Sequence, residues 1–93
     1  MEPESELGPD SVPRRPLHAR TRRFRDKVFI AVDNESAELS DTAAVIWTSV
    51  DGSRTIRDIA AVVQADYDVA EELALADVLE FVSEMAGSGF MEY

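Results

Sequence analysis

The sequence contains no cysteine, and this absence excludes disulfide bonds, zinc–thiolate sites and cysteine nucleophiles. It has one histidine, His18, and a metal site or a histidine-based nucleophile would need partners that the chain lacks. No glycine-rich phosphate loop occurs, and the many carboxylates are scattered over predicted helix caps and solvent-facing positions. We therefore expect a chain that is not an enzyme and that uses no metal and no cofactor.

Long apolar runs are missing as well. No stretch approaches the length that spans a membrane, and the N-terminus lacks the apolar segment of an export signal, which favours a cytoplasmic protein without membrane contact. Large apolar side chains are scarce in the first sixteen residues, which hold all four prolines. Such a segment buries too little surface to offset the entropy of ordering it. The expected organisation is a disordered tail over residues 1–16 and one domain over residues 17–93.

Positive charge is nearly absent from most of the chain. Residues 1–27 contain seven Lys or Arg against five Asp or Glu, whereas residues 28–93 contain two, Arg54 and Arg57, against fourteen. The domain therefore carries a negative field, which repels phosphate backbones and favours cationic or neutral partners. This charge argues against nucleic acid as a partner.

What the sequence does contain is a β-rich segment followed by three helical patterns. Residues 27–33, KVFIAVD, are apolar and β-branched, which predicts a strand buried on both faces or nearly so. Residues 33–35 have turn chemistry, and residues 36–39 alternate in polarity, which predicts a short strand returning antiparallel to the first. A weaker pattern from His18 to Phe24 allows a third strand.

Helical periodicity begins after the last predicted strand. Ser40 or Asp41 is expected to cap the first helix, and Gly52 is expected to take the left-handed position past its end. Thr55 and Asp58 have the spacing of a capping box at the start of the second helix. The order of elements predicts an α+β fold, a winged helix-turn-helix-like domain in which a three-stranded antiparallel sheet precedes three helices.

The third helix is predicted over residues 69–86, with Asp68 as its cap and Glu71 as the acid three places on. Its apolar residues fill an arc of roughly 160°, whereas a helix on one small core needs only about 100°. This width has two explanations, a broad contact with sheet and helices or a second flank that binds something else. The arc consists of Phe81, Ala74, Met85, Val78, Val82, Leu75, Ala86 and Leu79. We assign Trp47, Ile46, Leu75 and Leu79 to the core.

DNA binding is the first function that such a fold suggests. A recognition helix needs Arg, Lys, Asn or Gln side chains that reach base edges. The second helix offers only Arg57 and Gln64 for such contacts. The third helix is acidic and contains no Lys or Arg. We therefore keep a DNA-binding winged-helix transcriptional regulator only as an alternative function. A protein-interaction module such as an antitoxin is another alternative.

From about Arg20 onward, an ordered set of features resembles the PqqD-like family, whose members are also called RiPP recognition elements, after ribosomally synthesised and post-translationally modified peptides. The set covers roughly three-quarters of the chain, and its order and spacing are more specific than any single motif. It comprises the strand DKVFIAVD, the helix start LSDTAAVIW ending at Trp47, the turn DGSRTI, the pair Tyr67-Asp68, the triplet Asp77-Val78-Leu79 and the closing Gly89-Phe90.

The resemblance implies a non-catalytic peptide chaperone. It would bind the leader segment of a ribosomally synthesised precursor peptide and present it to a modifying enzyme or leader peptidase in natural-product biosynthesis. The leader would add a strand beside the third strand, in a groove walled by the third helix. Carried over by position, the peptide-binding residues are Asn34, Glu35, Ser36, Ala37, Glu38 and Leu39 on the strand, and Ala74, Asp77, Val78, Phe81, Glu84 and Met85 on the helix.

In this arrangement Phe81 and Met85 line an apolar pocket, and Asp77 and Glu84 meet a basic or amide group of the leader. The bland alternatives are core packing for the first pair and a solvated helix face for the second. The chain departs from many relatives in its tightly joined second and third strands and in its unusually acidic helical wall. An open strand edge also allows edge-to-edge pairing, so we expect a monomer or a weak homodimer.

Overall fold

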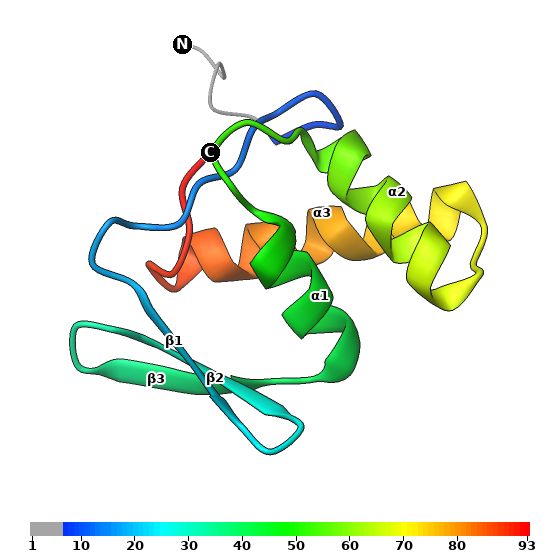
Figure 1. Cartoon of the computed structure of the whole chain (residues 1–93). Helices are drawn as coiled ribbons and strands as arrows, with labels where there is room; N and C mark the ends of the chain where they lie inside the picture. Colours follow the sequence, from blue (N-terminus) through cyan, green and yellow to red (C-terminus); the bar gives the residue numbers. More distant parts are fainter. Residues whose placement is uncertain (1–6) are drawn as a thin grey trace, which may run out of the picture.

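The computed structural model describes residues 7–93, and residues 1–6 lie outside the described part. An antiparallel sheet is followed by three helices (Figure 1), which confirms the predicted α+β fold and the order of its elements. The strands lie in the order β1-β2-β3. The elements are β1 Arg20–Phe24, β2 Lys27–Val32, β3 Glu35–Leu39, α1 Asp41–Ser49, α2 Ile56–Tyr67 and α3 Glu71–Gly87.

Two tight hairpins set the register of the sheet. Arg25 opens the loop between β1 and β2 with φ 59°, and Asp33 opens the loop between β2 and β3 with φ 55°. Along β2, burial alternates, with Val28 and Ile30 buried and Phe29 only half-buried. The strand predicted to be buried on both faces or nearly so is present, but it is fully buried only on the side of the core, and Phe29 and Ala31 on its other face are half-buried.

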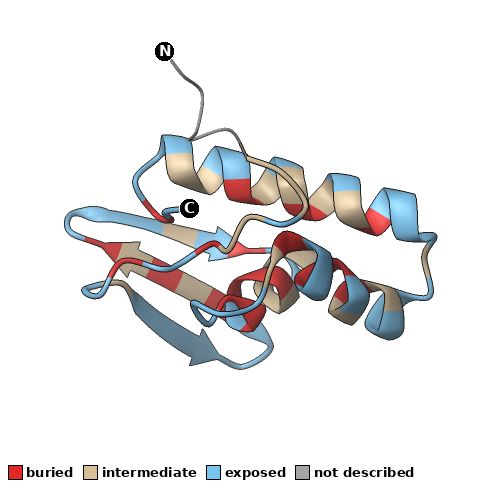
Figure 2. Ribbon diagram, turned by 90° about the horizontal axis from the view of Figure 1, so that it is seen from above, coloured by how far each residue is buried: buried red, intermediate tan, exposed pale blue. Residues whose placement is uncertain are grey.

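The core lies between that face of the sheet and the three helices (Figure 2). Trp47 is 0% exposed, and its Nε1 donates to Thr21 Oγ1 over 2.9 Å, which ties α1 to β1. Leu75 and Leu79 are half-buried and pack at the margin of this core. The fully or nearly fully buried members are Val28, Ile30, Val32, Leu39, Ile46, Trp47, Val50, Ile56, Ile59, Ala60, Val63, Ala74, Val78, Val82, Phe90 and Met91.

Two of the three predicted helix caps are confirmed. The Ser40 side chain caps α1, and Thr55 and Asp58 form both bonds of a capping box at the start of α2. The cap predicted for the third helix was wrong: Asp68 ends α2 in the left-handed conformation, and α3 follows Ala70 without a side-chain cap. Asp both caps helices and tolerates left-handed geometry, so its position in the sequence fits either role.

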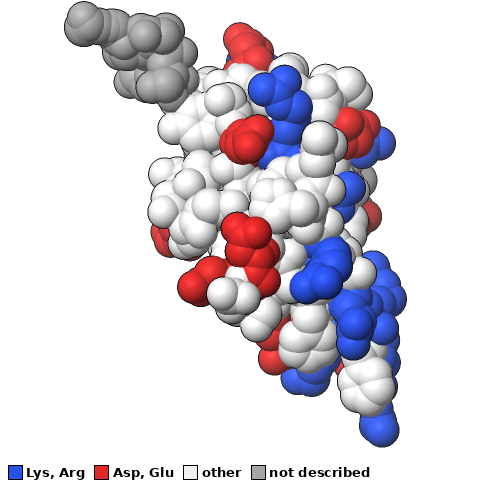
Figure 3. All heavy atoms as spheres, turned by 90° about the vertical axis from the view of Figure 1, so that its left-hand side faces the viewer, with Lys and Arg blue, Asp and Glu red and all other residues white. Residues whose placement is uncertain are grey.

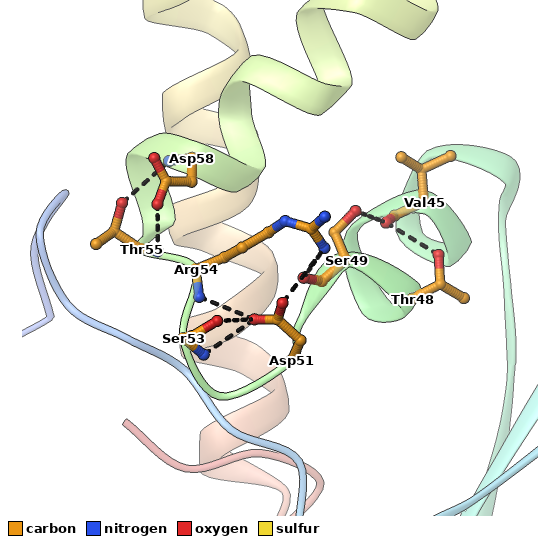
Figure 4. A network of polar contacts seen from close by, with 8 residues as sticks. All are labelled: Val45, Thr48, Ser49, Asp51, Ser53, Arg54, Thr55 and Asp58. Atoms are coloured by element: carbon orange, nitrogen blue, oxygen red, sulfur yellow. Dashed lines mark hydrogen bonds and ion pairs between the residues drawn. The ribbon is translucent and has the colours of Figure 1, made fainter.

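The connection between α1 and α2 is held by Asp51 (Figure 4). Its carboxylate accepts the N–H groups of Ser53 and Arg54 over 2.9 and 2.8 Å, and these two bonds hold the pKa of Asp51 below its ordinary value of 3.8. The Arg54 guanidinium donates to the carbonyl oxygen of Ser49, the last residue of α1. Gly52 has φ 84°, but it turns this loop and does not cap α1, which ends earlier.

Residues 7–16, which we call the N-terminal strap, pack against the domain and are not the disordered tail that was predicted for them (Figure 1). The backbone of Arg14 exchanges two hydrogen bonds with Glu92, over 2.7 and 2.8 Å. Two carbonyl groups of the strap accept the N–H groups of Ile56 and Arg57, both over 2.9 Å. The first N–H groups of a helix have no partner within it, and the strap satisfies two of them at α2.

Candidate functional site

β3 forms one edge of the sheet. Among residues 7–93 it pairs with β2 alone, and its other side pairs with no strand. The β2–β3 loop has two residues, and in such a turn the flanking residues, here Val32 and Glu35, form a hydrogen-bonded pair. Hydrogen-bonded and non-bonded pairs alternate along antiparallel strands. We infer that Ser36 and Glu38 direct their backbone N–H and C=O groups away from β2, toward the open edge.

The side chains of β3 divide between the two faces of the sheet. Leu39 is buried and Ala37 is half-buried on the core side, whereas Ser36 and Glu38 are exposed on the other. Glu38 Oε2 accepts from Lys27 Nζ over 3.0 Å, so this carboxylate has a cationic partner on the neighbouring strand. Of the predicted strand residues, Asn34 lies in the turn before β3 and Leu39 contributes its side chain to the core. The edge therefore offers mainly backbone.

A hollow of about 250 Å³ lies between α1 and α3, beside the end of β3. It contains three of the six predicted helix residues, together with residues of the first turns of α1. Its lining consists of Ser40, Thr42, Ala43, Ile46, Asp77, Glu80, Phe81 and Glu84. We call this hollow with the open edge of β3 the β3 groove.

The lining of the β3 groove combines one large apolar surface with acids. Phe81 is half-buried, and the core residue Ile46 lines the same hollow. Three carboxylates, from Asp77, Glu80 and Glu84, share the lining, and none of its residues is basic. Such a site suits an apolar group that has a cation close to it, because three carboxylates share this lining and none of them forms an ion pair within residues 7–93.

The structure redistributes the other residues predicted on α3. Ala74 and Val78 are 0% exposed, so their side chains belong to the core and not to the groove. Met85 is half-buried and packs against the core outside this hollow. Glu80 lines the hollow but was not predicted, although its spacing of three residues from Asp77 places it on the same helix face. The contribution of α1 depends on how the helices cross, which no sequence pattern gives.

Other kinds of site find little support among the described residues. No group of three or more His, Cys, Asp or Glu in residues 7–93 is placed to hold a metal ion. None of the helices in this range is long and apolar enough to cross a bilayer. Along α2 and α3 the only Lys or Arg is Arg57, so neither helix has the basic face of a DNA recognition helix.

Comparison with known proteins agrees with this geometry. Residues 26–91 match the family model of coenzyme PQQ synthesis protein D (PqqD). A solution NMR structure of the PqqD truncation of Methylobacterium extorquens PqqCD, a functional and stand-alone RiPP recognition element, is 26% identical with a TM-score of 0.82; the match covers 99% of this chain and 100% of that one. TbiB1, solved in complex with the TbiA(beta) leader peptide, is 16% identical with a TM-score of 0.77, covering 85% of this chain and 94% of that one.

No curated protein matches the chain. A three-stranded antiparallel sheet followed by three helices is the architecture that this chain shares with the M. extorquens recognition element. The chain belongs to the PqqD family, as the resemblance in its sequence predicted.

Proposed function

We propose that this chain binds the leader segment of a ribosomally synthesised precursor peptide by strand addition at β3. It presents the peptide to a modifying enzyme or leader peptidase, without catalysis of its own, in the cytoplasm where such peptides are made. The observation that supports the proposal most is the edge of β3, unpaired among residues 7–93, beside a hollow that combines the apolar side chain of Phe81 with three carboxylates. Two proteins of the same fold support it, one described as a RiPP recognition element and one solved with a leader peptide.

The groove is short, and this limits its affinity. Only Ser36 and Glu38 offer outward backbone groups in the inferred register, and the hollow of about 250 Å³ accommodates few side chains. Part of the free energy gained is lost in ordering an extended peptide. We expect a micromolar Kd, about −8 kcal/mol, for a leader of this kind.

The acidic lining of the groove predicts the chemistry of the leader. We propose an apolar anchor that contacts Phe81, next to a Lys or Arg that lies among Asp77, Glu80 and Glu84. A cation there relieves the repulsion between these three carboxylates and is attracted by the negative charge of the domain. The leader is therefore expected to carry a basic residue close to its apolar anchor.

Fluorescence anisotropy with synthetic leader peptides tests this specificity. The probe is a synthetic extended peptide with an apolar residue next to a Lys, compared with a matched peptide in which the Lys is Glu. The wild-type chain should bind the Glu peptide at least about tenfold more weakly, since attraction becomes repulsion. The double variant Asp77→Asn/Glu84→Gln should discriminate far less. Equal discrimination by both chains would show that these acids are solvated and make no contact.

Competition in the anisotropy assay tests the DNA-binding alternative, and analytical ultracentrifugation tests self-association. DNA affinity falls steeply with added salt, whereas strand addition through backbone bonds responds weakly. A short duplex should not compete with the leader. If the β3 edge pairs with a second copy, added leader should convert the weak dimer to monomer in analytical ultracentrifugation.

A further inference from the structure

A second surface, of opposite charge, runs from the strap to β2. Between residues 14 and 27 there are six arginines and one lysine against a single acid, Asp26. Figure 3 shows a group of Lys and Arg side chains gathered at the lower end of the molecule in that view, whereas the Lys and Arg side chains nearer the top lie beside Asp and Glu. We call this surface the Arg strip: Arg14, Arg15, Arg20, Arg22, Arg23, Arg25 and Lys27.

The arginines of the strip are not neutralised by the described part of the chain. Within residues 7–93, Lys27 pairs with Glu38, but none of the six arginines forms an ion pair with a carboxylate. All five residues of β1 are exposed. Two guanidinium groups instead lie over aromatic rings, Arg15 at 5.5 Å from the Trp47 centroid and Arg25 at 5.3 Å from that of Phe24. Within residues 7–93, a chain whose net charge is −10 thus keeps a cationic face whose arginines form no ion pair.

The strip is also hollowed and partly apolar. A hollow of about 590 Å³ is lined by residues of all three strands, among them Arg20, Arg22 and Phe29, and it reaches Ser36 of β3. A second hollow, of about 510 Å³, lies along the chain segment that contains Leu17. Leu17 is 105% exposed and Phe24 is 58% exposed, so apolar groups stand in solvent at both ends of β1.

The strip contains arginine rather than lysine, and this helps to decide between two roles, docking of a partner and protection of the exposed β1 edge. Proteins shield exposed strand edges with charges, above all with lysine. Protein–protein interfaces are instead enriched in arginine and aromatic residues and depleted in lysine. The planar guanidinium also binds a carboxylate through two parallel hydrogen bonds, which an ammonium group cannot do. Six arginines with Phe24 and Leu17 fit an interface better than they fit an edge guard.

We propose that the Arg strip docks an acidic surface of a partner protein. Given the proposed function, on which this identification rests, that partner is the enzyme that modifies the leader. Nucleic acid and anionic membranes fit less well, because residues 28–93 carry fourteen acids against two bases and repel a polyanion. Three of the seven residues of the strip lie on β1, across the sheet from β3, so leader and partner are able to bind together. The reach of its larger hollow to Ser36 brings the partner next to the added strand.

Titration of the ¹⁵N-labelled full chain with a short peptide of Glu-Glu-Leu repeats tests this surface. Amide shifts should map to the strip and not to α2 or α3. The variant Arg20→Glu/Arg22→Glu should weaken binding at least about tenfold, because two attractions become repulsions. The single variants Arg22→Glu and Arg57→Glu make the same change in net charge, and only the first, which lies on the strip, should weaken binding; Arg57→Glu should stay close to wild type because Arg57 lies away from the strip and has only an exposed ion pair with Asp10. Circular dichroism checks that each variant is folded. If Arg20→Glu/Arg22→Glu unfolds, Arg20→Gln/Arg22→Gln takes its place and is expected to lose part of the affinity.

Several outcomes would overturn the proposal: no shifts, shifts on the helices, equal losses in Arg22→Glu and Arg57→Glu, or tighter binding of a short DNA duplex or of phosphatidylserine vesicles at physiological salt. Leader binding measured on the same proteins separates this proposal from the proposed function. If Arg20→Glu/Arg22→Glu loses the acidic peptide and keeps the leader, both stand. If no acidic peptide binds while the leader still does, only the Arg strip proposal fails.

Discussion

The two edge strands of one sheet differ in how they present unpaired backbone. β1, with the sequence RTRRF, is exposed at every residue and carries three arginines. β3, with the sequence ESAEL, turns Ala37 and Leu39 toward the core, and its Glu38 is paired with Lys27. Charge on an edge strand discourages pairing with another chain. The difference agrees with the two proposals above, a peptide strand added at β3 and side-chain contacts with a partner at β1.

The largest expected effect comes from blocking one edge and then the other with proline. Ser36→Pro removes an outward N–H of β3, and the ring obstructs a new strand. We expect leader binding to fall by roughly a hundredfold or more while unfolding stays cooperative, because the lost donor is not needed within the sheet. Arg23→Pro removes an outward N–H of β1 in the equivalent register and should leave the leader Kd nearly unchanged.

Ala37→Pro gives the internal control for this register. The N–H of Ala37 points toward β2 in the inferred pattern, so proline there should break the β2–β3 ladder and lower the thermal midpoint. If Ser36→Pro unfolds the protein and Ala37→Pro does not, the outward and inward residues have been exchanged. The edge would then present Glu35, Ala37 and Leu39 to the leader.

A smaller effect is expected from the apolar wall of the β3 groove. Phe81→Ala removes the largest apolar side chain of the hollow and should weaken leader binding by about tenfold, with some loss of stability because Phe81 also packs on the core. Leu73→Ala, on the same helix and 54% exposed, is the matched control and should change neither quantity much. Equal leader affinity in the two variants would place Phe81 in the core alone.

Short-range patterns of this sequence predicted most of the fold. Alternation placed β3, turn chemistry placed the tight β2–β3 hairpin, and the Thr55–Asp58 spacing marked the start of α2. Each depends on residues a few positions apart, where local geometry decides the outcome. Asp68 was misassigned because its side chain suits two local structures, and the neighbouring residues do not discriminate between them.

Features set by long-range packing could not be predicted in the same way. The strap over residues 7–16 looks like a disordered segment by composition, yet it is ordered by hydrogen bonds to α2 and to Glu92, far along the chain. The apolar arc of α3 was correctly seen as wide, but its division into core and groove depends on how α1 crosses it. Ala74, which was predicted to line the groove, is therefore buried in the core, whereas Glu80, which was not predicted, lines the hollow.

The turn at Asp51 follows α1, and residues of α1 line the hollow of the β3 groove, so a change in this turn should also affect leader binding. Asp51→Asn keeps an acceptor but removes the charge that the loop stabilises. The folded-state pKa lies below the ordinary 3.8, so the carboxylate stabilises the fold above that pH, and its contribution is lost as the pH falls through the folded value.

We therefore expect Asp51→Asn to lower the thermal midpoint near neutral pH and to converge with the wild type in acid, as followed by circular dichroism. Asp66→Asn makes the same charge change on the exposed surface of α2 and controls for net charge. Leader binding should weaken in the first variant alone. A midpoint difference that stays constant down to strongly acid pH would show that the charge of Asp51 is not what stabilises the loop.

The smallest effect is expected at the first residue of each hairpin loop, Arg25 and Asp33, both of which have a positive φ. Arg25 adopts φ 59° although a left-handed conformation is costly for a long side chain, whereas Asp33 at φ 55° is of a type that tolerates it. Arg25→Asn should raise the free energy of unfolding by about 0.5–1 kcal/mol, and Asp33→Asn should change it by less. Urea denaturation measures both. If Arg25→Asn also weakens binding of the Glu-Glu-Leu peptide, the arginine contributes to that binding in spite of its strained backbone. A gain in stability with no loss of binding would show that Arg25 does not belong to the Arg strip.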